Sequence, residues 1–110
     1  MTVRIEFSRR ALEQLEDLYH YIESAASPAI AARYTGAVFD YCQSQQTFPM
    51  RGTMRDDIRS GVRVTNYRKR TVIAFVADAD QVLVLGVFHG GQGYQSALYD
   101  EPSTQDPSPP

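Results

Sequence analysis

Two nearly continuous apolar runs, separated by only three residues, set the strongest limit on how this chain can fold. The first run reads TVIAFVA from Thr71, and the second reads QVLVLGVF and ends at Phe88. The residues between them, Asp78 to Asp80, are typical of a tight turn, so we expect two neighbouring antiparallel strands. Strands this apolar are buried in a folded protein. The rest of the chain must therefore supply elements that cover a sheet.

Two segments with helical spacing precede these strands and can provide that cover. From about Ser8 to Glu23, apolar residues recur three and four positions apart, and Ser8 stands where an N-cap would. Ser27 and Pro28 match the N-cap and first residue of a second helix that reaches about Gln45. Because a short loop joins the two segments, we expect an antiparallel helical hairpin.

Alternation of apolar and polar residues predicts two further strands. Val3, Ile5 and Phe7 alternate with polar residues before the first helix, and Val62 and Val64 do so shortly before the apolar runs. The expected order is β-α-α-β-β-β. This order is an α+β fold in which an N-terminal helical hairpin packs on one face of a small antiparallel sheet and leaves the other face more open.

Length and composition fit one domain without a membrane segment. The chain has 110 residues, and we place the domain in residues 1–99 and a disordered tail in the Pro- and Ser-rich residues 100–110. The start MTVRIEF lacks a basic region before an apolar run, and no apolar stretch approaches the ~18 residues of a membrane span. We expect a cytoplasmic protein that does not contact membranes.

Motifs for metals and cofactors are not found. Cys42 is the only cysteine, which excludes an internal disulfide and a multi-cysteine metal site and indicates a core or helix-face residue. The sequence contains neither a GxxxxGKS phosphate loop nor an HExxH metal motif. We therefore expect no metal and no cofactor.

Positive charge is gathered in one short segment of an otherwise acidic chain. The formal net charge is −2, yet residues 51–70 hold seven of the 11 Lys and Arg residues against Asp56 and Asp57. Arginine forks bind carboxylates or phosphates through paired N–H bonds, so the segment could contact nucleic acid or an acidic protein segment. A solvated connection, with the aspartates pairing Arg55 and Arg59, is the alternative. The candidate binding residues are Arg51, Arg55, Arg59, Arg63, Tyr67, Arg68 and Arg70.

The strand within this segment places one arginine beside an aromatic residue. Arg63 alternates with Val62 and Val64, so if the valines face the core, Arg63 points to the opposite face of the sheet. Thr65 and Tyr67 project on the same side as Arg63. We expect that side to be the more open face.

Five motifs follow one another in an order that matches one family. They are a strand entering FSRRALEQL, the helix end DLYHYI, the Phe48-Pro49-x-Arg51-Gly52 pattern, the Arg-x-x-x-Tyr strand from Arg63 to Tyr67, and a last strand closing on His89-Gly90. In this order and spacing the chain resembles the ParE-type toxins of the RelE/ParE superfamily, from bacterial toxin–antitoxin modules. The resemblance runs from Val3 to about Gly90 and makes residues 1–99 a RelE/ParE-like toxin domain.

This resemblance implies a small toxin that a cognate ParD-like antitoxin holds inactive by wrapping it with a C-terminal segment. The complex would repress its own operon and touch operator DNA only through the antitoxin. For the ParE branch the implied action is inhibition of DNA gyrase without catalysis, with a role in plasmid stabilisation. For the RelE branch it is ribosome-dependent cleavage of mRNA.

The nuclease alternative requires a base for the 2′-OH, cations for the phosphorane charge and an acid for the leaving oxygen. Arg63, Arg68, His89 and Tyr94 are the candidates for these roles. Residues 51–70 contain no Glu and one Lys, so the lysine-rich set of one nuclease subgroup is missing. We therefore place gyrase inhibition first, with no catalytic residue, and mRNA cleavage second. The third hypothesis is a non-toxic antitoxin-binding module, because HGGQG ends the sheet where many ParE-like sequences have a nearby basic residue.

Overall fold

The computed structural model describes residues 3–90, and it confirms the α+β class and the order of the expected helices and strands. The elements are β1 (Arg4–Phe7), α1 (Arg9–Ala25), α2 (Pro28–Gln43), the 3₁₀ turn η1 (Ser44–Gln46), β2 (Thr53–Met54), β3 (Val62–Tyr67), β4 (Thr71–Ala77) and β5 (Gln81–His89). Tyr94 and residues 100–110, on which we placed a catalytic candidate and a tail, lie outside the described residues.

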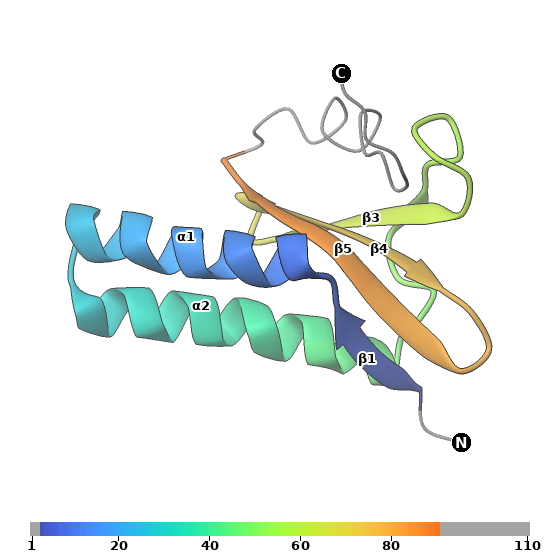
Figure 1. Ribbon diagram of the computed structural model, residues 1–110, viewed down its shortest axis with the longest axis horizontal. Coiled ribbons are helices and arrows are strands. Elements are labelled where there is room, and N and C mark those ends of the chain that lie inside the picture. Colours follow the sequence, from blue (N-terminus) through green and yellow to red (C-terminus); the bar gives the residue numbers. More distant parts are fainter. Residues whose placement is uncertain (1–2, 91–110) are drawn as a thin grey trace.

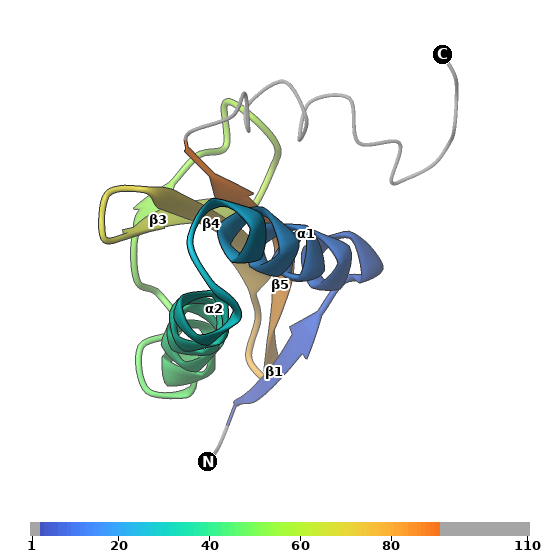
Figure 2. The ribbon, with the colours of Figure 1, turned by 90° about the vertical axis from the view of Figure 1, so that its left-hand side faces the viewer.

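The strands form one sheet with the order β1-β5-β4-β3-β2, and the two helices lie as a hairpin along one face of it (Figure 1). Figure 2 shows the hairpin end-on, with α1 above β5 in the view and α2 below α1 and to its left. The β3-β4-β5 meander is antiparallel as expected. Two features differ from the expectation. β1 pairs in parallel with β5, so the sheet is mixed, and the two-residue strand β2 extends the far edge next to β3.

Ser8 joins the first helix to the last strand. Its Oγ accepts a hydrogen bond from Ala11 N at 3.0 Å, which is the expected N-cap, and donates one to Leu85 O at 3.0 Å. One turn later, Gln14 Oε1 accepts a hydrogen bond from Val87 N at 2.8 Å. β1 has ended by this point, so the N-cap of α1 and a side chain of its second turn satisfy backbone groups of β5 that β1 does not reach.

The main core lies between the helices and the sheet. Its buried members are Ala11, Leu18, Val38, Cys42, Ile73, Phe75, Val82, Val84 and Val87. Cys42 is a core residue, as predicted. Burial raises the pKa of its thiol to about 12, against an opposing effect of the Arg51 charge, so the thiol stays protonated and unreactive.

Arg63, Thr65 and Tyr67 share one face of β3 as predicted, but that face is covered by the helices and is not the open one. Arg63 does alternate with Val62 and Val64, but the valines face away from the helices, whereas Arg63 pairs with Phe75 of the main core. Thr65 shares the face of Arg63. Both faces of the sheet carry a buried apolar cluster, so the alternation in β3 identifies its apolar face but not the face that the helices cover.

The second face of the sheet has its own apolar cluster rather than an open surface. Its buried members are Ile58, Val62, Val64, Val72, Ala74 and Phe88. Ile58 comes from the loop that precedes β3. Phe88 lies close over Gly86, where an added Cβ would come within 2.5 Å of a ring carbon. Gly86 therefore allows the Phe88 ring to cover this face.

Candidate functional site

Arg63 is committed to the loop that leads into β2. Its Nε donates to Arg51 O at 3.2 Å, and one terminal nitrogen donates to Met50 O at 2.7 Å and Gly52 O at 3.3 Å. Gly52 has a φ of 84°, and a Cβ there would lie 2.4 Å from Val64 O, so the loop approaches β3 too closely for any other residue. Arg63 thus holds the fold together at a position that we predicted as a ligand contact.

Arg51 is also engaged within the protein. Its guanidinium donates to Ser44 Oγ at 2.8 Å. The guanidinium carbon lies 4.4 Å from the centre of the Tyr41 ring and 5.1 Å from that of Phe48. These cation–π contacts hold Arg51 between Tyr41 of α2 and Phe48 of the following loop, and its side chain remains partly exposed.

One of the two aspartates in the basic segment neutralises an arginine, as the alternative interpretation predicts. Arg55 donates to both carboxylate oxygens of Asp57, at 2.9 and 2.8 Å, and this contact lowers the pKa of Asp57. Asp56 instead accepts a hydrogen bond from Gly61 N at 2.8 Å. The side chain of Arg59 has no hydrogen bond or ion pair within residues 3–90.

The remaining cations form the turn between β3 and β4, which we call the cationic turn and define as Arg68, Lys69 and Arg70. Arg70 N donates to Tyr67 O at 3.2 Å and closes the turn. Arg68 and Lys69 have φ angles of 55° and 62°. Hairpin turns with two positive φ angles strongly prefer Asn and Gly, so this turn holds two unfavoured residues in a strained conformation.

All three side chains of the cationic turn are exposed. Arg68 Nε donates to Tyr67 Oη at 3.0 Å, and its guanidinium lies over the same ring at 5.4 Å from the centre. Within the described part of the chain, none of the three cations forms an ion pair. The positive charge of residues 51–70 is therefore free mainly at this turn.

A buried threonine connects the base of the turn to a helix and to the end of β5. Thr71 Oγ1 lies 2.8 Å from Tyr34 Oη and 3.0 Å from His89 Nδ1. The Tyr34 ring centre is 5.8 Å from that of Tyr67 and 5.7 Å from that of His89. Burial, and secondarily the charge of Arg70, lower the pKa of His89 from its ordinary 6.5, which favours the neutral ring.

A half-open groove of about 510 Å³ lies beside this cluster, between α1 and the end of β5. It is lined by Gln14, Asp17, Leu18, Tyr21, Val87, His89 and Gly90. Nothing in the sequence spacing marks Tyr21, Tyr34 or Thr71 as neighbours of His89. Tyr34 in particular fits the apolar stripe of α2, which conceals its hydroxyl contact with Thr71.

An exposed apolar surface lies at the opposite end of β3. Phe48, Met50 and Met54 are 55%, 61% and 42% exposed, and we call them the apolar edge patch. A shallow cavity of about 540 Å³ runs along residues 47–51 and includes Arg51. Large exposed apolar residues grouped together and bordered by charge are typical of a protein-binding surface. The Phe-Pro-x-Arg-Gly motif is the sequence signal for this place.

The four nuclease candidates are not brought together in one place. Arg68 and His89 lie at the same end of the sheet, where Thr71 pairs with His89. Arg63 is four residues before Tyr67 on β3, roughly 13 Å away along the strand, and is bound to loop carbonyls. Tyr94 lies outside the described residues.

Within residues 3–90 no group of three or more His, Cys, Asp or Glu side chains is arranged to hold a metal ion. In the same range, no helix has the length and apolar character needed to cross a bilayer.

Comparisons with known proteins give the family. No curated protein matches this sequence. The fold resembles that of the chromosomal ParDE toxin–antitoxin system from P. aeruginosa, with a TM-score of 0.70 and 16% identity over 80% of this chain and 96% of that chain. It also resembles the RelBE2 toxin–antitoxin complex from Mycobacterium tuberculosis, with a TM-score of 0.58 and 20% identity over 81% of this chain and 99% of that chain.

These identities show a shared fold alone, whereas the sequence carries the family signal. The family model described as the ParE toxin of the type II toxin–antitoxin system parDE matches residues 5–94, which is most of the chain. The protein therefore belongs to the ParE toxin family of type II toxin–antitoxin systems.

Proposed function

We propose that this ParE-family protein inhibits DNA gyrase without catalysis of its own and is neutralised by a cognate ParD-like antitoxin. The observation that carries the proposal is the commitment of Arg63 to three loop carbonyls. A nuclease built on Arg63, Arg68 and His89 needs these groups around one phosphate, and Arg63 is held at the other end of β3.

The mRNA endoribonuclease remains a second candidate because Arg68 and His89 do lie at one end of the sheet. A neutral imidazole can accept a proton, and Arg68 could stabilise charge on a phosphate. Changing His89 to Ala together with Tyr94 to Phe separates the two candidates. Toxicity is kept if the protein acts on gyrase and is lost if these residues cleave RNA.

Induced expression of the chain without an antitoxin tests the proposed target in cells. DNA synthesis and protein synthesis are followed by pulse labelling with thymidine and methionine after induction. Gyrase inhibition predicts that thymidine incorporation falls first. An earlier fall in methionine incorporation contradicts it in favour of mRNA cleavage, and continued growth at full expression indicates the non-toxic module.

For the antitoxin we propose the apolar edge patch, with Arg51 beside it and Arg59 from the loop that follows β2, as the docking surface. Exposed Phe48 and Met50 offer apolar contact, while Arg51 and Arg59 favour acidic side chains in the partner. Changing Met50 to Lys or Arg59 to Glu should weaken antitoxin binding by about tenfold or more.

The control matched to Arg59→Glu is Arg33→Glu, which makes the same change of charge at an exposed position of α2. Arg63 is unsuitable as a test residue, because its loss frees the loop that carries the patch. If both docking variants bind the antitoxin as tightly as the control does, the docking surface lies elsewhere.

A further inference from the structure

The cationic turn concentrates positive charge that no acidic side chain of residues 3–90 neutralises. Arg55 and Arg63 are held by a carboxylate and by backbone carbonyls, respectively. By contrast, the exposed side chains of the cationic turn form no ion pair within residues 3–90. In a chain with a net charge of −2, this is a strong local field of the opposite sign.

The backbone of the turn is held in a conformation that other residues would adopt more easily. Both Arg68 and Lys69 have positive φ angles, where Asn and Gly are favoured. Strain of this kind persists where the surrounding structure over-determines it, and it gathers at binding sites. The strain thus points to a use for the two side chains.

The turn is also fixed from below. Gly90 N donates to Arg70 O at 2.6 Å, and Tyr67 both bonds Arg68 and lies under its guanidinium. These contacts orient the turn before a ligand arrives, which lowers the entropy cost of binding.

The chemistry of the turn fits phosphates better than an acidic peptide. A peptide partner needs apolar area as well as charge, and the apolar edge patch lies at the other end of β3. The exposed residues at the tip are Asn66, Arg68, Lys69 and Arg70, all polar. Contacts to a nucleic-acid backbone depend mainly on such charge and need little apolar burial.

We propose that the cationic turn binds the sugar–phosphate backbone of DNA, so that the toxin contacts the DNA held by gyrase as well as the enzyme. The choice of DNA over RNA rests on the proposed function. The proposed phosphate-binding site itself rests on the charge and the backbone geometry of the cationic turn.

Direct binding to a labelled DNA duplex of about 20 base pairs tests the proposal by fluorescence anisotropy at several salt concentrations. The full chain is made by cell-free synthesis, because a toxin would arrest the growth of an expression host. Three phosphate contacts predict a slope of about −2.7 for log affinity against log salt. The turn variant Arg68→Gln, Lys69→Gln, Arg70→Gln should bind about tenfold more weakly or worse.

The control variant is Arg4→Gln, Arg9→Gln, Arg33→Gln, which removes the same charge from exposed positions elsewhere. It should bind DNA within about twofold of the unmodified chain if the contact is local to the turn. Thermal unfolding of both variants shows that they are folded.

Several outcomes overturn the proposal. Absence of DNA binding at low salt would do so, and so would equal losses of DNA affinity in the turn variant and the control variant. Tighter binding to RNA of the same length would also contradict it. So would a turn variant that loses affinity for the antitoxin while its affinity for DNA is unchanged. Supercoiling by purified gyrase is measured separately, so the two proposals fail separately. A chain that binds DNA through the turn but does not inhibit gyrase refutes the proposed function and leaves the DNA site in place.

Discussion

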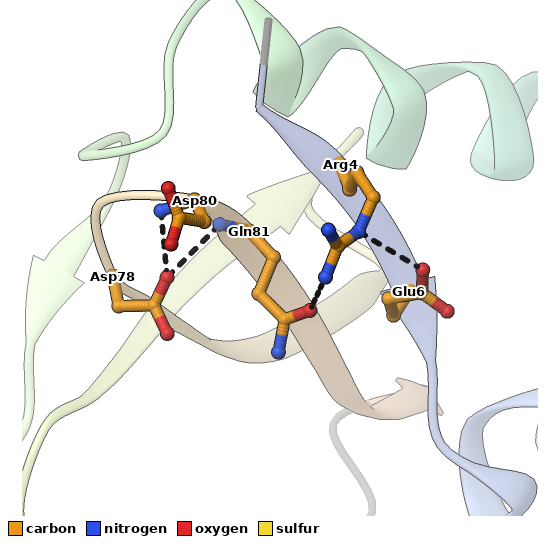
Figure 3. A network of polar contacts seen from close by, with 5 residues as sticks. All are labelled: Arg4, Glu6, Asp78, Asp80 and Gln81. Carbon is orange, nitrogen blue, oxygen red and sulfur yellow. Dashed lines mark hydrogen bonds and ion pairs between the residues drawn. The ribbon is translucent and has the colours of Figure 1, made fainter.

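Two turns at opposite ends of β4 differ in how they treat their charged residues. In the turn between β4 and β5, Asp78 accepts hydrogen bonds from Asp80 N at 2.8 Å and Gln81 N at 2.9 Å (Figure 3). Gln81 in turn accepts one from Arg4 at 2.8 Å, and Arg4 lies 3.6 Å from Glu6. In the cationic turn, charges point to solvent from a strained backbone.

The difference separates a turn that serves folding from one that serves binding. Asp78 satisfies backbone donors and closes the loop, which is the ordinary role of Asp at such a position. Arg68 and Lys69 occupy positions where other residues would be more stable. Residues that contradict the local conformational preference and lower stability are expected at functional sites, where they serve binding or catalysis.

The largest effect is expected from Phe75 in β4, the strand that connects the two turns. Phe75 is completely buried in the main core, so changing it to Ala should cost about 3–5 kcal/mol of unfolding free energy. Urea unfolding measures this loss. Changing the half-buried Val76 on the other face to Ala is the control and should cost clearly less. Equal losses of unfolding free energy would mean that the apolar clusters on the two faces of the sheet contribute equally to stability.

A second prediction is that the cationic turn can be made more stable. Changing Arg68 to Asn and Lys69 to Gly supplies the residues that positive φ angles favour, and should raise the melting temperature by roughly 3–6 °C. Differential scanning calorimetry measures the shift. Changing Ala79 to Gly in the other turn is the control and should not raise the melting temperature, since Ala79 has no positive φ angle. A lower melting temperature for the Asn-Gly variant would show that the turn is not strained.

A third prediction concerns the acidic turn. Changing Asp78 to Ala removes two backbone contacts and should lower the melting temperature by roughly 2–4 °C at pH 7. Hydrogen bonds from Asp80 N and then Gln81 N hold the pKa of Asp78 below 3.8. Its contribution is therefore present above pH 3.8 and is lost as the pH falls through the lower folded value. The melting temperatures of the unmodified protein and the Asp78 variant should therefore converge in acid. A difference that stays constant with pH would mean that the ionised carboxylate of Asp78 is not the cause of the stabilisation.

The smallest effect is expected at His89. Its pKa is lowered in the folded protein, so the unfolded chain takes up a proton first as the pH falls below 6.5. Stability should therefore decline from pH 6.5 toward the lower folded value and level off below it. Changing His89 to Gln should leave stability near pH 7 almost unchanged and reduce this decline. An identical decline in the variant would assign it to other groups.

Much of the fold is readable from local signals. Ser8 and the Ser27-Pro28 pair mark the helix starts, and the residues from Asp78 to Asp80 mark a hairpin turn, because capping and turn chemistry act over a few residues. The parallel pairing of β1 and the short strand β2 have no such signal. Arg63 holds the loop that precedes β2 against β3, through contacts between residues 11 to 13 positions apart that no local propensity predicts.

The candidate site is predictable only as a segment. Composition identifies residues 51–70, but it cannot tell that Arg63 and Arg55 are used within the protein while Arg68 and Lys69 remain accessible. That division depends on which backbone carbonyls and carboxylates each guanidinium reaches. The link from Tyr34 through Thr71 to His89 is equally hidden, because its members come from three separate elements.

Inhibition of purified gyrase by the unmodified chain and by the variant Arg68→Asn, Lys69→Gly tests the central claim most directly. DNA supercoiling is measured at matched toxin concentrations, with the Ala79→Gly protein as the control. If the cationic turn is kept for binding, the Asn-Gly variant is the more stable protein and the weaker inhibitor by about tenfold or more. A variant that is more stable and inhibits equally well would contradict the claim.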